Sequence, residues 1–125
     1  MSKKNLETSI QEFKDGCFKL YEIKQADESF PTDYLHLITN KPFWFEERSI
    51  SNSLKFQSES RDVNLTMKIR IPQEKQITSM NVLKIGKEYH KVFNAYHFKN
   101  DDGERLTDIT LQKYENPVLE SEQDG

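Results

Sequence analysis

Apolar and polar residues alternate strictly from Val63 to Ile71, and the pattern ends at Pro72. Val, Leu, Met and Ile residues occupy every second position, while Asn, Thr, Lys and Arg residues fill the positions between them. A β-strand with one buried face and one wet face is the regular structure with this period of two. The segment therefore predicts an antiparallel sheet with a single packed face, as in the wall of a small sandwich or barrel.

Further apolar runs predict the neighbouring strands. A strand is expected over Cys17 to Lys24, a polar loop over Gln25 to Thr32, and a short strand or helical turn over Tyr34 to Ile38. Two apolar runs, Met80 to Ile85 and Tyr89 to Phe98, flank Gly86-Lys87 and predict a hairpin. A turn over Lys99 to Arg105 then leads to a last strand over Leu106 to Tyr114. Consecutive hairpins favour a meander or barrel over an alternating helix and strand plan.

The ends of the chain and one internal segment lack this pattern. Leu6, Ile10 and Phe13 have helical spacing and predict a short N-terminal helix or arm, ending at Asp15-Gly16, where glycine can supply a turn with positive φ. The serine-rich segment Ser49 to Asp62 predicts a long loop, with at most part of a strand. From Glu115 onward the chain has four acidic residues and no basic one, which predicts a mobile tail.

Together these elements predict a mainly β protein. The expected fold is a small antiparallel β-barrel or sandwich of about six strands, with a short N-terminal helix or arm and a long inter-strand loop. One barrel domain covers 1–114, with its core over 13–114 and the loop at 49–62, and an acidic flexible tail covers 115–125. A chain of 125 residues is long enough for one domain with a modest core.

Composition narrows the function classes. The net charge of −3 argues against a protein whose main task is to bind a phosphate backbone. Hydrophobic residues make up 34% of the chain and charged residues 31%. Cys17 is the only cysteine, so a reducing compartment is expected. Met1 to Gln11 does not resemble a signal peptide, and no segment approaches the roughly 20 apolar residues of a membrane span. We therefore expect a soluble protein made in the cytoplasm.

No catalytic, metal or cofactor site is predicted. His36, His90 and His97 do not stand at any zinc-binding spacing, and His90 and His97 would lie on opposite faces of a regular strand. No nucleophile, base and orienting group are suggested together by their spacing, so an enzyme is not expected.

Two aromatic groups suggest binding surfaces instead. Alternation sends Phe43 and Phe45 to one face of their strand and Trp44 to the other. All three rings are core residues in one interpretation, and Trp44 anchors a contact with another subunit in the alternative. A second group could form a stacking surface like that of small OB-like barrels that bind single-stranded nucleic acid, although an amphipathic strand has the same pattern. That group consists of Phe93, Tyr96 and Phe98 with Lys91 and Lys99.

Four motifs from about Phe13 to Tyr114 resemble a known family. They are Phe13-Lys14-Asp15-Gly16 before the first strand, Phe43-Trp44-Phe45-Glu46 followed by Ser49-Ile50, the strand end Lys68-Ile69-Arg70-Ile71-Pro72, and Ile85-Gly86-Lys87-Glu88-Tyr89-His90-Lys91-Val92. In this order they look like the head-closure proteins of long-tailed bacteriophages, also called head-tail adaptor or joining proteins.

The resemblance implies a structural virion protein. Such a protein is a β-barrel subunit of a homo-oligomeric ring below the portal, made in the host cytoplasm, which joins the capsid connector to the tail and helps to close the head around packaged double-stranded DNA. Its partners would be portal or adaptor ring proteins and tail-terminator or tail proteins, with no membrane. The loop would face the channel or neighbouring subunits, with Ser49, Lys55 and Arg61 as candidate positions and Trp44, Phe43 and Phe45 as interface candidates. A tail-terminator or tail-completion subunit is the alternative within virion proteins.

Overall fold

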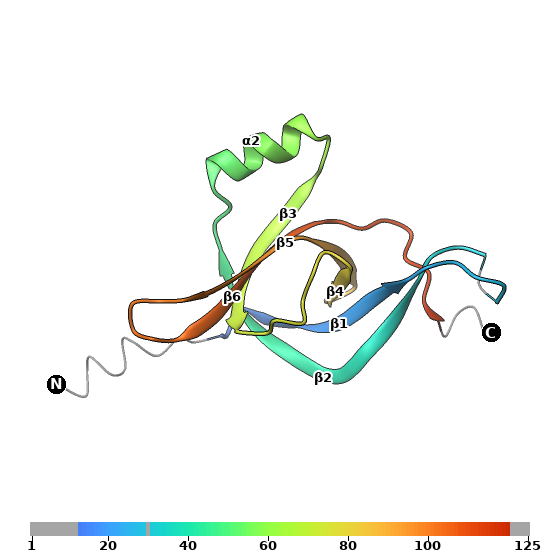
Figure 1. Cartoon of the computed structure of the whole chain (residues 1–125), viewed down its shortest axis with the longest axis horizontal. Coiled ribbons are helices and arrows are strands. Elements are labelled where there is room, and N and C mark those ends of the chain that lie inside the picture. The colour runs from blue at the N-terminus through green and yellow to red at the C-terminus, as the bar shows by residue number, and fades with distance from the viewer. Residues whose placement is uncertain (1–12, 30, 121–125) are drawn as a thin grey trace.

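The computed structural model describes residues 13–29 and 31–120 of the chain (Figure 1). In chain order, the elements are β1 (Gly16–Lys24), β2 (Tyr34–Arg48), α2 (Asn52–Ser60), β3 (Leu65–Pro72), β4 (Asn81–Ile85), β5 (Glu88–Lys99) and β6 (Arg105–Lys113). No helix in the described ranges is long and apolar enough to cross a membrane.

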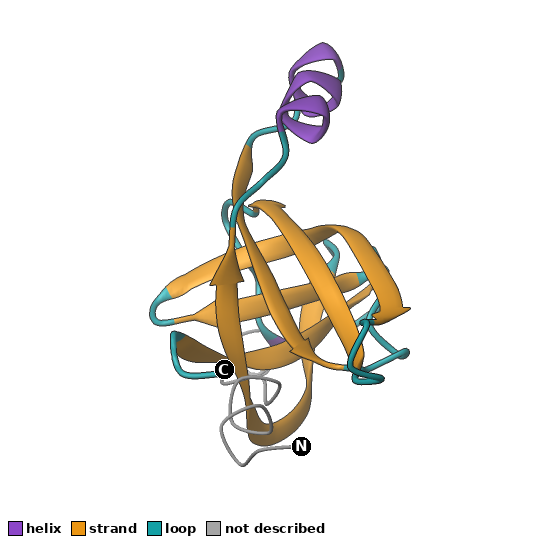
Figure 2. Ribbon diagram, turned by 90° about the vertical axis from the view of Figure 1, so that its left-hand side faces the viewer, coloured by secondary structure: helices purple, strands orange, loops and turns teal. Residues whose placement is uncertain are grey.

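The six strands form a closed antiparallel barrel (Figure 2), and their order around it is β1-β2-β3-β6-β5-β4. The barrel closes where β4 pairs with β1, with Leu20 opposite Leu83 and Tyr21 opposite Val82. Closure gives every strand two neighbours, although β2 and β3 are joined only where Glu46–Arg48 pairs with Lys68–Arg70. The prediction of a small antiparallel barrel is therefore confirmed.

The main core fills the inside of the barrel. Alternation in β3 sends Ile69 and Ile71 inward, both almost fully buried, while Lys68 and Arg70 lie on the outer face. The other buried members of the core are Phe18, Leu20, Phe45, Ile77, Leu83, Val92, Ile109 and Leu111. Each buried side chain of this size contributes roughly 1.5–3 kcal/mol, so this core is the main source of stability.

A second, smaller cluster is covered by the chain that follows β6. Tyr21, Leu35 and Val82 are buried there, with Tyr114 and Leu119 packed against them. The backbone N–H of Leu35 donates to the carbonyl oxygen of Val118 at 2.7 Å, and an isolated parallel bridge joins Leu35 to Leu119. The prediction of a mobile tail is therefore wrong for 115–120, because Leu119 has an apolar site on the barrel. Residues 121–125 lie outside the described residues.

The segment predicted as a long loop contains helix α2, so the loop prediction is wrong for these helical residues. Ser51 caps the helix, because its Oγ accepts a hydrogen bond from the Leu54 N–H at 3.2 Å. At the other end Asp62 adopts φ 59°, and the Val63 N–H donates to the Ser58 carbonyl at 2.8 Å, as in a Schellman motif. The prediction missed the helix because the segment has no continuous apolar stripe. Figures 1 and 2 show α2 standing away from the barrel wall.

Two other expectations also change. β2 is one strand of fifteen residues that includes both the predicted short strand at Tyr34 to Ile38 and the Phe-Trp-Phe motif. Gly16 does not form a turn after a helix, since it begins β1 and pairs with Phe45. The predicted N-terminal helix or arm, with Leu6 and Ile10, lies outside the described residues.

Candidate interaction surfaces

Trp44 is the exposed member of the aromatic triplet in β2. Phe45 is 2% exposed, whereas Trp44 is 56% exposed. Phe43 is half-buried and stacks on Phe18, with ring centroids 5.1 Å apart. The predicted alternation is therefore confirmed. Burial excludes Phe45 as an interface residue of the folded barrel and leaves Trp44 as the candidate, with Phe43 beside it.

Trp44 borders a surface cavity of about 430 Å³. Its walls come from three parts of the chain, namely the start of the described residues, the middle of β2, and the end of β3 with the residues after it. The lining residues are Phe13, Lys41, Pro42, Phe43, Trp44, Pro72, Gln73 and Glu74. Rings of Phe, Pro and Trp give the cavity a largely apolar wall, while Lys41 and Glu74 supply one charge of each sign at its border.

Helix α2 and its flanking residues form an arm, residues 49–64, between β2 and β3. The three positions singled out in the sequence, Ser49, Lys55 and Arg61, are all exposed on this arm. The arm also carries Phe56, which at 73% exposure is the most exposed large apolar side chain in the described part of the chain. An aromatic ring held in water on a projecting helix is the feature that sequence reasoning missed. The sign of this feature in the sequence is one aromatic residue in a serine-rich segment.

The outer face of the barrel carries a cross-strand row of polar residues. Register places Glu46 opposite Arg70, Arg70 opposite Asp108 and Asp108 opposite Tyr96. The Arg70 guanidinium donates two hydrogen bonds to the Asp108 carboxylate, from Nε to Oδ1 at 2.7 Å and from Nη2 to Oδ2 at 3.0 Å. These bonds raise the pKa of Arg70 above its ordinary value, against a smaller lowering by burial. The row therefore holds Arg70 charged and fixed in orientation.

Arg70 supports an aromatic pair on the same face. Its guanidinium carbon lies 5.0 Å from the centroid of the Phe98 ring, and Tyr96 stacks on Phe98 with centroids 5.3 Å apart. Tyr96 is 60% exposed. Of the predicted stacking surface, the structure thus brings Tyr96 and Phe98 together.

The other members of that predicted surface lie elsewhere. Phe93 sits at a register shift between Val92 and Asn94 and lines a separate cavity with Lys75 and His97. Lys91 is five residues along β5 from Tyr96, about 16 Å at ~3.3 Å per residue, and Lys99 pairs with Arg105 at the end of the strand. The positive charge beside the aromatic pair therefore comes from Arg70, a residue that the sequence pattern did not place near Phe98.

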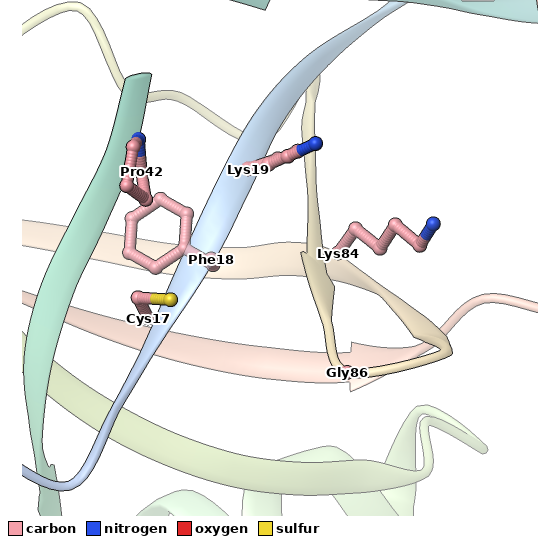
Figure 3. A pocket seen from close by; sticks show the side chains of 6 residues that line it. All are labelled: Cys17, Phe18, Lys19, Pro42, Lys84 and Gly86. Atoms are coloured by element: carbon pink, nitrogen blue, oxygen red, sulfur yellow. The ribbon is translucent and has the colours of Figure 1, made fainter. Parts of the chain in front are cut away.

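Two lysines face each other across the β1–β4 junction that closes the barrel. Lys19 and Lys84 are directly opposed in register. Figure 3 shows both side chains extending in the same direction from neighbouring strands, away from Cys17 and Phe18, around a cavity of about 300 Å³. Lys84 Nζ lies 5.6 Å from the centroid of the Tyr89 ring, and no ion pair within the described ranges includes either lysine. Like charges placed opposite each other destabilise a sheet.

The three histidines lie in separate environments. His36 is 3.3 Å from Glu120, His90 is 2.9 Å from the Thr66 hydroxyl, and His97 is 2.8 Å from the Thr107 hydroxyl. The bulge in β5 changes the phase of alternation, so His90 and His97 fall on the inward set with Val92 and Ala95, not on opposite faces as a regular strand would have them. No group of three or more His, Cys, Asp or Glu side chains within residues 13–29 and 31–120 could hold a metal ion.

In comparisons with known proteins, no family model matches the chain and no curated protein is similar enough in sequence to indicate a relationship.

Proposed function

We propose that this protein is a structural component of a long-tailed phage virion that joins the capsid connector to the tail. In this role, copies of the barrel form a ring below the portal and help to close the head around packaged DNA. The proposal combines the resemblance in sequence with one structural observation. A closed barrel projects an arm, residues 49–64, from the connection between β2 and β3, where the resemblance places the loop that faces the channel or the neighbouring subunit.

The closed barrel suits a subunit that must stay separate until it reaches its assembly site. Every strand has a paired neighbour on each side, although β2 before Glu46 pairs only with β1, apart from the bridge at Leu35. Closure thus limits uncontrolled strand addition, and contacts with partners would be made mainly by side chains and by the arm. The proposed mechanism is mechanical, because the protein would act by docking to its partners and by steric closure of the head.

The charge of the arm suits a surface near moving DNA. Lys55 and Arg61 are balanced in number by Glu59 and Asp62. A strongly basic lining would bind each phosphate that it met, because every contact with a lysine or arginine releases counterions. An arm of balanced charge would not hold passing DNA by its phosphates, so closure of the head would depend on the bulk of the arm and not on its charge.

The test is to disrupt the coding sequence in the phage genome that carries it and to examine the lysate by electron microscopy. We expect complete heads and complete tails that remain unjoined, with DNA lost from the heads, and we expect joining to return when purified protein is added. Normal virions in the absence of the protein would contradict the proposal. A tail terminator, the alternative within virion proteins, would instead yield tails of abnormal length.

A second candidate function is binding of single-stranded nucleic acid, favoured by the exposed Tyr96 ring stacked on Phe98 beside Arg70. Stacking of a base on such a ring is worth roughly 1–3 kcal/mol. Filter binding of a labelled oligonucleotide at graded salt separates the two functions. Binding that weakens with salt and is lost in Tyr96→Ala would favour this candidate, whereas the head-tail joining function predicts no such binding.

A further inference from the structure

The arm has too little packing of its own to explain its helix. Helix α2 has nine residues, of which only Ser58 is buried, whereas an isolated helix needs about 12–15 residues to be even marginally stable in water. Three of its nine residues are serines, which are weaker helix formers than alanine. The cap at Ser51 and the Schellman motif at Asp62 close its ends, but neither covers Phe56. A helix of this kind gains stability when a partner covers its exposed apolar side chain.

The cavity beside Trp44 matches Phe56 in size and character. It measures about 430 Å³ and is walled by phenylalanine, proline and tryptophan side chains, and a cavity of about 150 Å³ is enough to hold a benzene ring in a protein interior. A buried phenylalanine removes about 150–250 Å² from water. Phe56 and this cavity are therefore complementary as an apolar anchor and its receptor.

The charges around the two features are also complementary. Lys55 precedes Phe56 in the helix and Glu59 follows it by about one turn, both also lining a pocket at the base of the arm, while Glu74 and Lys41 line the cavity. Among the described residues, none of these four charged groups forms an ion pair. Each surface thus presents one positive and one negative group that can pair with the other surface.

A chain cannot place its own Phe56 in its own cavity. Strand β3 runs from the arm at Leu65 to the cavity at Pro72, a length of about 23 Å at ~3.3 Å per residue. The helix also points away from the barrel (Figure 2). The anchor must come from a second copy.

We propose that Phe56 on the arm of one copy inserts into the Trp44 cavity of the next copy, with Lys55 paired to Glu74 and Glu59 paired to Lys41. This contact is heterologous, so each copy uses one arm and one cavity, and repeated contacts close into a ring where the rotation between copies permits it. The inference rests on the proposed function for its biological setting, because it names how the ring subunits meet. One aromatic anchor and two exposed ion pairs make a weak contact, which is expected to dissociate on dilution.

Sedimentation velocity tests the contact in the purified full chain, from low micromolar concentrations to on the order of 1 mM, the range of weak association. The wild type is expected to associate as concentration rises. Phe56→Ala and Trp44→Ala should each raise the dissociation constant at least about tenfold, as loss of an aromatic anchor does. Both side chains are exposed, so circular dichroism should show that both variants are folded. A wild type that stays monomeric over the whole range would overturn the proposal.

Mixing the two variants tests the direction of the contact. Phe56→Ala keeps an intact cavity and Trp44→Ala keeps an intact arm, so an equimolar mixture should form a two-chain complex that neither variant forms alone. If the mixture stays monomeric while the wild type associates, the contact is not heterologous and the proposal fails.

Charge reversal tests the pairing. Lys55→Glu and Glu74→Lys should each weaken association, and the double variant should restore it, whereas Lys87→Glu, in the turn between β4 and β5, serves as a control that leaves association unchanged. Failure of the double variant to recover would overturn the assigned ion pair. If these results hold while disruption of the gene leaves head-tail joining intact, then the proposed function fails and the contact stands.

Discussion

The ring of Phe45 packs directly against Gly16, its partner in the β1–β2 register. A Cβ atom at position 16 would lie 2.8 Å from Phe45 Cζ, closer than side chains approach one another in folded proteins. Phe45 is almost fully buried and stacks on Phe18, so its ring has little room to move. The main core can therefore pack in this way only because residue 16 has no side chain.

Substitution of Gly16 by alanine should therefore destabilise the barrel. We expect a loss of about 1–3 kcal/mol, the usual cost of overpacking a core, measured by urea denaturation. The control is the same substitution in a Phe45→Leu background, where the smaller side chain relieves the contact and the loss from Gly16→Ala should be smaller, with the backbone strain of alanine at φ 158° remaining. Equal losses in both backgrounds would show that the ring is not the obstacle.

Removal of the segment after β6 should also lower stability. Leu119 packs on the cluster of Tyr21, Leu35 and Val82, so Leu119→Ala should cost about 1–2 kcal/mol, less than the 2–5 kcal/mol of a fully buried leucine. Truncation after Tyr114 should cost more, because it also removes the Leu35–Val118 hydrogen bond. Thermal melting measures both, with Glu115→Ala as the exposed control. An unchanged melting temperature in the truncated chain would restore the interpretation of a mobile tail.

The limits of sequence reasoning are visible in these same elements. Local alternation was enough to place Ile69 and Ile71 in the core and to separate Trp44 from Phe45, because each pattern depends on a single strand. Barrel closure by β1 and β4 depends on pairing between segments about 60 residues apart, as with Tyr21 and Val82, and no local pattern encodes that register.

The candidate surfaces were harder to predict for a similar reason. Arg70 reaches Phe98 only because β3 and β5 both flank β6, so the pair is a product of topology. Helix α2 depends on capping by Ser51 and on the backbone of Asp62, which are signals at single positions. Leu119 is one of few apolar residues in an acidic segment, so the composition of that segment did not predict that Leu119 packs on the barrel.

The Arg70–Asp108 pair should be important to stability although it lies on the outer face. Both side chains are mostly buried, and Asp108→Asn would leave the guanidinium without its carboxylate. Loss of hydrogen bonds to a charged group predicts a cost of about 1.5–3 kcal/mol. The double variant Arg70→Met with Asp108→Val should recover much of this loss, since it removes both charges together. Urea denaturation of the single and double variants measures the coupling energy between Arg70 and Asp108. Strictly additive losses of stability would contradict this prediction.

Stability should depend on pH through His90. Burial lowers the pKa of His90 below its ordinary value, and the Glu88 carboxylate offsets part of this effect. The unfolded chain therefore binds the proton more readily than the folded chain does, so stability is full above the unfolded pKa of about 6.5 and falls as pH drops below it. Urea denaturation at pH 7.5 and pH 5 should show a smaller difference in His90→Gln than in the wild type. An equal pH dependence in both would exclude His90 as the cause.

Relief of the Lys19–Lys84 repulsion should stabilise the closing seam of the barrel. Lys19→Glu places opposite charges across the β1–β4 register, and a favourable cross-strand pair is worth roughly 0.2–1 kcal/mol. Because both side chains reach solvent, the gain should shrink as salt screens the charges. Thermal melting at low and high salt measures it, with Lys19→Gln as the control that removes the repulsion without adding attraction. A Lys19→Glu variant no more stable than Lys19→Gln at low salt would show that the two ammonium groups do not interact across the seam.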